Sequence, residues 1–524
     1  MAVNVIRRNT VADALWRTAR RVPDKPAIVC GEVGWSYAHF DAIVTRAALG
    51  LAASGVRPGD RIAVLSRNSH SFAVLRFAVA RLGAVLVPIN FMLLAGEVAH
   101  LLRHSGATRI CVDSEFAPLG IEAAREAARV EQILWLPGEE SRPQPEGTIC
   151  FETLWSGSGG EAGSLDREVG SPSVAQIMYT SGTESMPKGV MLTHDAIMTQ
   201  YLSCVVDLEI AEGDRVLHSL PMYHCAQLDA FFGPAVLVGA YNVITRTPEP
   251  ERALRLIEGH RITSFFAPPT VWISLLRSPV FARVDLSSLQ KGYYGASIMP
   301  GEILRELQRC LPKLRLWNAY GQTEIAPLAA VLKPEDQLRK AGSAGKPVIH
   351  VASRVVREDM TDVEVGEVGE LVHRSPQLLS GYLDDPDKTA AAFAGGWFHS
   401  GDLAVMDEEG YITIVDRKKD MIKTGGENVS SREVEEAIYK LPGVGEVAVV
   451  GLPDPRWVEV VSAFIVLKKG AELSETDVEV HCAACLGAYK RPKRVFFTEE
   501  LPKNASGKVM KRELRSEYCN RPGG

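Results

Sequence analysis

The chain has no uninterrupted apolar stretch long enough to cross a membrane. Its longest apolar region, Leu228 to Ile244, contains Asp229, Pro234 and two glycines, whereas a membrane-spanning helix needs about 20 consecutive apolar residues. The N-terminal region is rich in arginine but lacks the continuous apolar core of a signal peptide. These absences argue against an integral membrane protein, and we expect a soluble protein of the cytoplasm.

Cysteine is sparse, and neither sign of charge dominates. Nine cysteines in 524 residues are too few for a disulfide framework, which indicates a reducing compartment. Cys482 and Cys485 stand beside His481, but the sequence has no second cysteine pair to complete a zinc site. The net charge of −6 gives no electrostatic reason to expect nucleic acid or an anionic membrane as a partner.

Strand-like and helix-like segments alternate along the first 150 residues. Short apolar runs at 62–65, 84–88, 110–112 and 133–136 are separated by helical patterns at 39–54, 71–82, 96–104 and 119–130. The same alternation returns from residue 174 to about 332, after a polar, glycine-rich connector at 157–173. This pattern predicts an α/β fold with two βα-type sheets, each largely parallel and covered by helices.

The pattern of apolar and polar residues changes at residue 342. Short alternating runs punctuated by glycine and proline, at 350–356, 369–373 and 411–415, predict a β-rich lobe over about 342–415. The charged cluster at 416–420 is the best candidate for a domain boundary. We therefore predict a large N-terminal domain, residues 1–417, and a small α/β C-terminal domain, residues 418–524.

The segment from Tyr179 to Val190 has the composition of an anion-binding loop. Gly182 and Gly189 let the backbone approach a ligand closely. Hydroxyls and the ammonium of Lys188 can donate to an anion, and successive backbone N–H groups can cradle phosphate oxygens. The loop is not of the Walker type, because no Gly-Lys-Ser/Thr opens a helix here. Alone, such a segment is typical of a surface loop.

The segment also resembles the phosphate-binding loop of the adenylate-forming superfamily, which includes acyl-CoA synthetases, luciferases and peptide-synthetase adenylation domains. Two positions depart from that pattern: Glu184 replaces a hydroxyl residue, and Ser185 replaces glycine. Other segments resemble further motifs of the superfamily in the same order, and the resemblance extends over essentially the whole chain. These segments are 220–224, 295–297, 318–324, 397–402, 416–420 and 504–508.

The resemblance implies a nucleotide site. Tyr320 would pack on the adenine, Thr323 would contact the α-phosphate, and Glu324 would coordinate Mg²⁺, for which a carboxylate is a suitable hard ligand. Asp402 would accept the ribose hydroxyls, and Arg417 would reach the ribose or a phosphate. The remaining nucleotide-binding residues implied are Thr180, Ser181, Gly182, Thr183, Lys188, Gly295, Ala296, Ser297 and Gly321.

The resemblance also implies catalytic and moving parts. Lys508 would bridge the substrate carboxylate and the α-phosphate, and His224 would be a gate between nucleotide and acyl pocket. Lys419 matches the hinge about which the small domain rotates in relatives. After that rotation Gly425 and Gly426 would line the tunnel through which the thiol of coenzyme A arrives.

The expected function is therefore that of an acyl-CoA synthetase using ATP, Mg²⁺ and coenzyme A through an acyl-adenylate intermediate. Aromatic residues near segments that line the acyl pocket in relatives suit a bulky apolar carboxylic acid, although aromatics also commonly fill a core. They are Phe231, Phe232, Phe265, Phe266, Trp272, Tyr293 and Tyr294. The particular acid and the oligomeric state stay open, a homodimer included.

Two alternatives remain. A negative charge at Glu184 about 4 Å from a phosphate oxygen would cost about 4 kcal/mol at an effective dielectric near 20. The chain would then transfer to coenzyme A the acyl group of an adenylate made by a separate adenylating enzyme. The second alternative is a non-catalytic adenylate-binding module, against which the presence of Lys508 argues, since binding alone does not need it.

Overall fold

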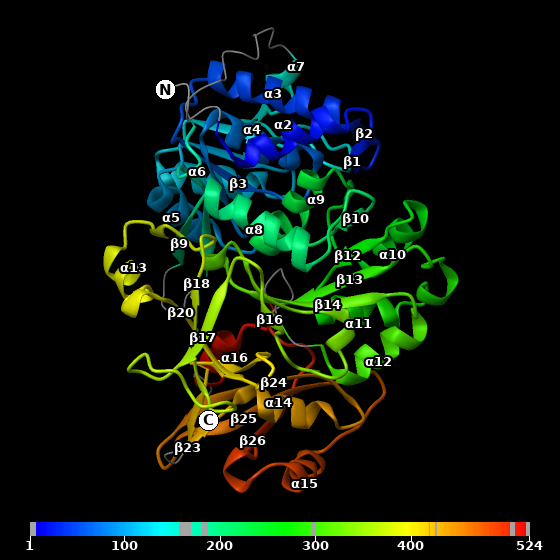
Figure 1. Ribbon diagram of the computed structural model, residues 1–524, viewed down its shortest axis with the longest axis vertical. Coiled ribbons are helices and arrows are strands. Elements are labelled where there is room, and N and C mark those ends of the chain that lie inside the picture. The colour runs from blue at the N-terminus through cyan, green and yellow to red at the C-terminus, as the bar shows by residue number, and fades with distance from the viewer. Residues whose placement is uncertain are drawn as a thin grey trace. The chain divides into compact units, whose positions relative to one another are not determined.

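The computed structural model describes residues 7–156, 169–180, 187–295, 297, 299–418, 420–424, 427–503 and 509–519. The chain folds into two compact units (Figure 1). The larger unit comprises Met1–Ala341, Gly345–Ala352 and Arg374–Phe393, and the smaller unit comprises Gly342–Ala344, Ser353–His373 and Ala394–Gly524. The domain boundary at residues 417 and 418 stays a prediction.

The first sheet of the larger unit has eight strands in the order β19-β9-β8-β4-β3-β5-β6-β7. Its strands are β3 (Arg61–Leu65), β4 (Val85–Pro88), β5 (Arg109–Val112), β6 (Gln132–Trp135), β7 (Ile149–Cys150), β8 (Val174–Thr180), β9 (Lys188–Thr193) and β19 (Gly381–Tyr382). The strands from β4 to β7 pair in parallel, as does β4 with β8, and β9 pairs antiparallel with both β8 and β19. The intervening helices are α3 (Tyr37–Ala53), α4 (His70–Leu82), α5 (Ala95–Ser105) and α6 (Ala117–Ala127).

The second sheet has nine strands in the order β16-β15-β14-β13-β12-β10-β11-β1-β2. They are β1 (Pro26–Cys30), β2 (Val33–Ser36), β10 (Arg215–His218), β11 (Tyr241–Ile244), β12 (Ser264–Phe266), β13 (Lys291–Gly295), β14 (Arg315–Gly321), β15 (Leu328–Leu332) and β16 (Lys346–Pro347). Its helices are α2 (Val11–Arg21), α8 (His194–Asp207), α9 (Gly233–Val238), α10 (Pro250–Gly259), α11 (Pro269–Arg277) and α12 (Gly301–Cys310). The prediction of two largely parallel βα-type sheets is confirmed.

The smaller unit contains two further sheets. The β-rich lobe has the order β17-β18-β20-β21, with β17 (Ala352–Val356), β18 (Gly369–Arg374), β20 (Phe398–Met406) and β21 (Ile412–Arg417). The C-terminal sheet has the order β23-β22-β25-β24, with β26 paired to β25. Its elements are β22 (Ile422–Thr424), β23 (Glu427–Val429), β24 (Val444–Asp454), β25 (Val458–Leu467), β26 (Arg494–Phe497), α14 (Ser431–Tyr439), α15 (Glu475–Cys485) and α16 (Lys511–Cys519).

Alternation along β24 explains how helices cover both faces of the C-terminal sheet. Val449 belongs to the core that contains Val434 of α14 and Cys482 of α15. Its neighbour Val450 belongs to the core that contains Leu514 of α16. Successive side chains of a strand point to opposite faces, so one strand contributes to both cores. The predicted α/β character of the C-terminal part is confirmed.

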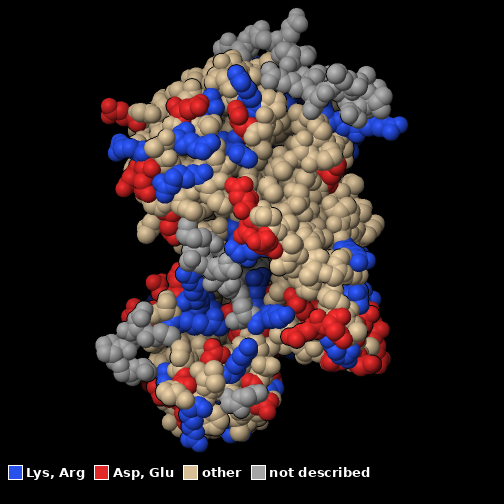
Figure 2. All heavy atoms as spheres, turned by 90° about the vertical axis from the view of Figure 1, so that its left-hand side faces the viewer, with Lys and Arg blue, Asp and Glu red and all other residues tan. Residues whose placement is uncertain are grey.

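The surface charge and the length of the helices can be compared with what the sequence predicts. Within the described ranges, no helix is long and apolar enough to cross a membrane. Lysine and arginine side chains mingle with aspartate and glutamate over the upper part of the face drawn in Figure 2. This mixed surface matches the small net charge of −6.

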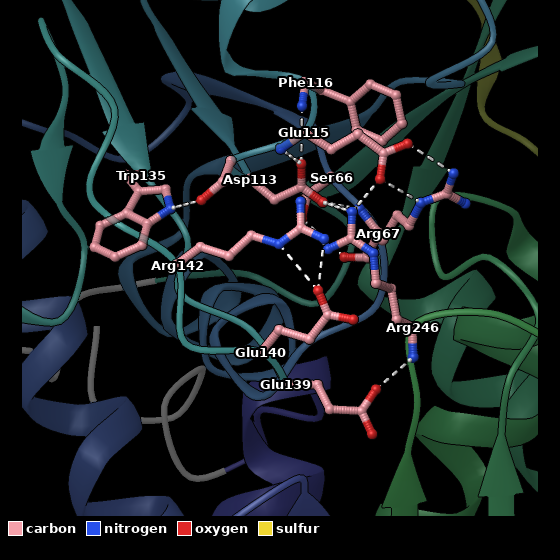
Figure 3. A network of polar contacts seen from close by, with 11 residues as sticks. Ser66, Arg67, Asp113, Glu115, Phe116, Trp135, Glu139, Glu140, Arg142 and Arg246 are labelled. Atoms are coloured by element: carbon pink, nitrogen blue, oxygen red, sulfur yellow. Dashed lines mark hydrogen bonds and ion pairs between the residues drawn. The ribbon is translucent and has the colours of Figure 1, made fainter. Parts of the chain in front are cut away.

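Loops at the carboxyl ends of strands from both sheets meet in a network of polar contacts (Figure 3). Arg67, after β3, lies with its Nη2 2.9 Å from Oε1 of Glu115, which follows β5. Arg246, after β11 of the second sheet, pairs with the same carboxylate. The hydrogen bond from Arg67, helped by Arg246, lowers the pKa of Glu115 to about 2 although partial burial acts in the opposite sense. The network therefore ties the two sheets together.

A buried ion pair also joins the two halves of the larger unit. Nη2 of Arg76, on α4, lies 2.9 Å from Oδ1 of Asp229, and the two side chains are 1% and 0% exposed. Asp229 lies on the π-helix η2 (Ala226–Phe232), which follows β10. Gln176 donates to its Oδ2 at 2.6 Å and Tyr201 donates to its Oδ1 at 3.4 Å. Burial raises the pKa of Asp229, and Arg76 opposes that shift.

Substitution of Arg76 by methionine should leave the Asp229 carboxylate buried without its cation. We expect Arg76→Met to lower the free energy of unfolding by about 3–5 kcal/mol, measured by urea denaturation. Combining it with Asp229→Leu should recover most of the loss, because a buried pair can be replaced by apolar residues at little cost.

The matched control is Arg305→Met. Arg305 pairs with Glu302 on α12, where the two side chains are 64% and 87% exposed. Its loss should change stability by less than about 1 kcal/mol. Equal stability of Arg76→Met and Arg305→Met would contradict the assigned role of the buried pair.

Candidate active site

The two ends of the predicted phosphate loop lie opposite each other. Thr180 ends β8 and Lys188 begins β9, and these residues are antiparallel partners. The loop between them, with the predicted ligands Ser181, Gly182 and Thr183, lies outside the described residues, as do Glu184 and Ser185. The sheet therefore positions Thr180 and the Lys188 side chain at the base of this loop.

The glycines predicted to lie near the adenine, Gly295 and Gly321, end two adjacent parallel strands, β13 and β14. Gly295 at the end of β13 pairs with Ala319 of β14, and a Cβ on Gly295 would lie 2.5 Å from the Ala319 carbonyl oxygen. At Gly321, the end of β14, a Cβ would lie 1.8 Å from the Pro327 oxygen. Both glycines are needed for close backbone approach. Ser297 is exposed, and Ala296 lies outside the described residues.

The next turn carries a carboxylate and a hydroxyl. Thr323 and Glu324 lie on the 3₁₀ helix η4 (Thr323–Ile325), directly after β14. Thr323 is buried, and its Oγ1 lies 3.4 Å from Sγ of Cys225. The Glu324 carboxylate accepts a hydrogen bond at 3.2 Å from the hydroxyl of Tyr382, on β19. Tyr320 is half-buried on β14.

The predicted gate residue lies close to this turn in the fold. His224 precedes Cys225, whose sulfur contacts Thr323. Nδ1 of His224 accepts a hydrogen bond from the Ala226 N–H at 3.2 Å, at the start of η2. This bond makes Nδ1 an acceptor and orients the ring. Within the larger unit, the structure thus brings the 220–224 segment to the Thr323–Glu324 turn.

A lysine and a carboxylate also meet at one tyrosine. Nζ of Lys188 lies 5.4 Å from the centre of the Tyr382 ring, whose hydroxyl bonds to Glu324. Sequence reasoning missed both Tyr382 and Cys225. In the sequence, Tyr382 is marked only by the glycine before it, and the residues that it contacts are distant along the chain. Cys225 follows the predicted site residue His224, but a cysteine in such a position is usually an ordinary small apolar side chain.

The predicted ribose-binding residues lie in the smaller unit. Asp402 on β20 and Arg417 on β21 are antiparallel partners, and Nε of Arg417 lies 2.9 Å from Oδ1 of Asp402. The Asp402 side chain is 5% exposed and that of Arg417 is 36% exposed. This pairing presents an acceptor beside a donor-rich cation. Lys508, the hinge residue Lys419 and the tunnel glycines Gly425 and Gly426 lie outside the described residues.

The aromatic residues expected near the acyl pocket divide between two faces of the second sheet. Phe231 stacks on Phe266 with ring centres 4.2 Å apart, in a cluster that includes Tyr293 and packs against Ala226 and Tyr320. Phe265, Trp272 and Tyr294 belong instead to the core that contains residues of α10 and α12. Adjacent strand residues point to opposite faces, so Phe265 and Phe266 enter different cores. Phe232 contacts Phe77 and His218.

Two family matches cover the chain in succession. Residues 15–383 match the AMP-binding enzyme family, and residues 433–508 match the AMP-binding enzyme C-terminal domain. The chain therefore belongs to the AMP-binding enzymes of the adenylate-forming superfamily, as its motifs indicated. Within that superfamily it groups with AMP-forming acid–thiol ligases.

Relatives and solved structures match nearly the whole chain. Feruloyl-CoA synthase of Amycolatopsis sp is 36% identical over 96% of this chain and 98% of its own length. Long-chain-fatty-acid–CoA ligase FadD13 of Mycobacterium tuberculosis is 36% identical over 93% and 94%. The crystal structure of the anthranilate CoA ligase AuaEII in complex with anthranoyl-AMP has a TM-score of 0.88 at 27% identity, covering 97% of both chains.

A methyl group at Gly321 should disturb nucleotide binding. In Gly321→Ala the new Cβ would overlap the Pro327 oxygen, so the turn carrying Thr323 and Glu324 must move. We expect the affinity for AMP, measured by titration calorimetry, to fall at least about tenfold, or 1.4 kcal/mol. Gly259→Ala is the control, because a Cβ there meets no atom within 4 Å. AMP affinity unchanged in Gly321→Ala would contradict the assigned position of this turn.

Proposed function

We propose that the protein converts an apolar carboxylic acid to its coenzyme A thioester through an acyl-adenylate intermediate. The observation that carries the proposal is the constellation around Tyr382, where the Lys188 ammonium and the Glu324 carboxylate approach one side chain at the base of the phosphate loop. A cation beside a carboxylate is what binding of a metal-complexed polyphosphate requires.

The donor set fits Mg²⁺. The carboxylate of Glu324 is a hard oxygen ligand, and the residue is only half-buried. The backbone of Glu324 is held in place because its carbonyl oxygen accepts a hydrogen bond from the Leu379 N–H at 2.8 Å. Glu324 would hold the ion, with the Thr323 hydroxyl nearby. When bound, the ion would neutralise charge on the phosphates of ATP.

In the first half-reaction an oxygen of the substrate carboxylate attacks the α-phosphorus of ATP, the bond to the β-phosphate oxygen breaks, and pyrophosphate leaves. Repulsion between anions is the main obstacle, so positioned cations supply most of the benefit. Lys188 at the loop and Lys508 at the α-phosphate are the residues proposed for this role. Tyr320 and Gly321 would hold the adenine, and Asp402 with Arg417 the ribose.

In the second half-reaction the thiol of coenzyme A attacks the acyl carbon, the bond to the AMP oxygen breaks, and the thiol proton is released. We propose that rotation of residues 418–524 about Lys419 withdraws Lys508 and brings Gly425 and Gly426 to the thiol tunnel. Separate conformations for opposed chemical steps explain the use of a hinge. His224 would separate nucleotide from acyl group.

The proposed acyl substrate is bulky and apolar. The stacked Phe231 and Phe266, with Tyr293, border Ala226 and Tyr320 and offer an aromatic wall beside the gate residue. Relatives named for feruloyl-CoA, anthranilate and long-chain fatty acids support the same chemical class, an acid whose carboxylate is attached to an apolar body.

Glu184 favours a second candidate, a ligase that accepts only preformed acyl-adenylate. Its negative charge lies in the loop expected to hold the β- and γ-phosphates, where it would repel ATP more than AMP. The two functions differ in one assay. If wild-type protein forms thioester from synthetic acyl-adenylate but releases no pyrophosphate from ATP and acid, Glu184→Thr should restore that release.

Lys508 should be needed in one half-reaction only. We expect Lys508→Ala to slow pyrophosphate release from ATP and an apolar acid by about 10²-fold or more, while thioester formation from synthetic acyl-adenylate and coenzyme A stays near the wild-type rate. Lys469→Ala is the control, since Lys469 is an exposed lysine of the same unit. Retained AMP binding with no turnover of the wild-type enzyme in either assay would favour the binding-module alternative.

A further inference from the structure

A short segment of the larger unit lies between two parts of the site. The chain leaves this unit after Ala352 and returns at Arg374. We call residues Leu379 to Leu383, which include β19, the strap. After the strap, α13 (Pro386–Ala392) begins (yellow in Figure 1). No motif of the sequence predicts a role for this segment.

Backbone hydrogen bonds attach the strap to two elements at once. The N–H of Leu379 donates to the carbonyl oxygen of Glu324 at 2.8 Å. The N–H groups of Ser380 and Leu383 donate to the oxygens of Met191 and Gly189, at 3.0 and 2.8 Å. One end of the strap therefore holds the turn that carries Glu324, and the rest of it holds β9, the strand that begins with Lys188.

The Tyr382 side chain also connects the two elements, because it contacts both Glu324 and Lys188. Its hydroxyl donates to Oε1 of Glu324 at 3.2 Å, and Nζ of Lys188 lies 5.4 Å from its ring centre, within the range of a cation–π interaction. Tyr382 is 9% exposed. A carboxylate can only accept a hydrogen bond, so the hydroxyl of Tyr382 is the donor in this contact.

The backbone of Tyr382 is held from the other side by α13. Its N–H donates to Oγ1 of Thr389 at 2.9 Å, and that hydroxyl donates to the Asp385 oxygen at 2.8 Å. Gly381 has φ +155°, and a Cβ there would lie 3.2 Å from Cγ2 of Thr389. A tyrosine fixed at both backbone and hydroxyl can fix the groups that it touches.

We infer that Tyr382 is a positioning residue for adenylation. It holds the Glu324 carboxylate through its hydroxyl and the Lys188 ammonium over its ring, so that both meet the metal-bound phosphates of ATP in fixed places. Acyl-adenylate has lost the β- and γ-phosphates, so the thioester-forming step does not need this positioning. The inference rests on the proposed function, in particular on the roles of Glu324 and Lys188.

The test variant is Tyr382→Phe, which keeps the ring over Lys188 and removes only the hydroxyl. We expect pyrophosphate release to fall about tenfold, the loss of a hydrogen bond to a charged group. We also expect a higher MgCl₂ concentration at half-maximal rate. Thioester formation from synthetic acyl-adenylate and coenzyme A should stay within about twofold of wild type.

The chain offers a closely matched control in Tyr241→Phe. Tyr241 is also 9% exposed, its hydroxyl bonds to Nδ1 of His260 at 3.1 Å, and the Arg215 guanidinium lies 4.1 Å from its ring centre. A merely structural role for Tyr382 predicts the same small change in thermal midpoint for both variants and no shift in the MgCl₂ dependence of either.

Two further measurements separate this inference from the proposed function. In the Glu324→Gln background, Tyr382→Phe should have little additional effect, because residues that act through one another are not additive. Binding of α,β-methylene-ATP with MgCl₂, measured by calorimetry, requires no turnover and should weaken about tenfold in Tyr382→Phe. Absence of wild-type pyrophosphate release contradicts the proposed function alone, whereas equal analogue binding by wild type and Tyr382→Phe at every MgCl₂ concentration overturns the role of Tyr382.

Discussion

The buried pair between Arg76 and Asp229 is the interaction on which the arrangement of the larger unit most depends. Charged groups this far from water are tolerated only when they are paired and hydrogen-bonded. Arg76 comes from a helix of the first sheet, and Asp229 comes from the π-helix that begins directly after the His224 turn. A shift of one sheet against the other would separate the charges, so the pair fixes where the gate segment stands. The Glu115 network reinforces the same alignment at the strand ends.

A second constraint concerns the site itself. The Lys188 ammonium and the Glu324 carboxylate come from separate elements and must lie near each other without neutralising each other, so that both stay available to a ligand. The strap solves this by hydrogen-bonding to both elements, with Tyr382 between an ammonium and a carboxylate. The glycines at 295 and 321 serve the same end by letting neighbouring backbone approach to distances that exclude a Cβ. Rigid placement of donors and acceptors before the substrate arrives is the main source of electrostatic catalysis.

The residues proposed to bind the nucleotide come from both compact units. Lys188, Glu324 and the aromatic wall belong to the larger unit, whereas Asp402 and Arg417 belong to the smaller one. Each unit has its own cores, with alternate residues of a single strand entering different cores in the C-terminal sheet.

The sequence by itself determined the features that are local. Hydrophobic periodicity indicated individual strands and helices in the first 150 residues and a second alternating region from 174 to about 332, and contiguous motifs indicated the loop between Thr180 and Lys188 and the segment that carries Thr323 and Glu324. The tertiary structure alone decided the contacts that join distant residues: Tyr382 with Glu324, 58 positions apart, and Arg76 with Asp229, 153 positions apart. It also separated Phe265 from Phe266. Periodicity and motif spacing report only on near neighbours in the chain, whereas pairing partners are chosen by burial and hydrogen bonding across the whole fold.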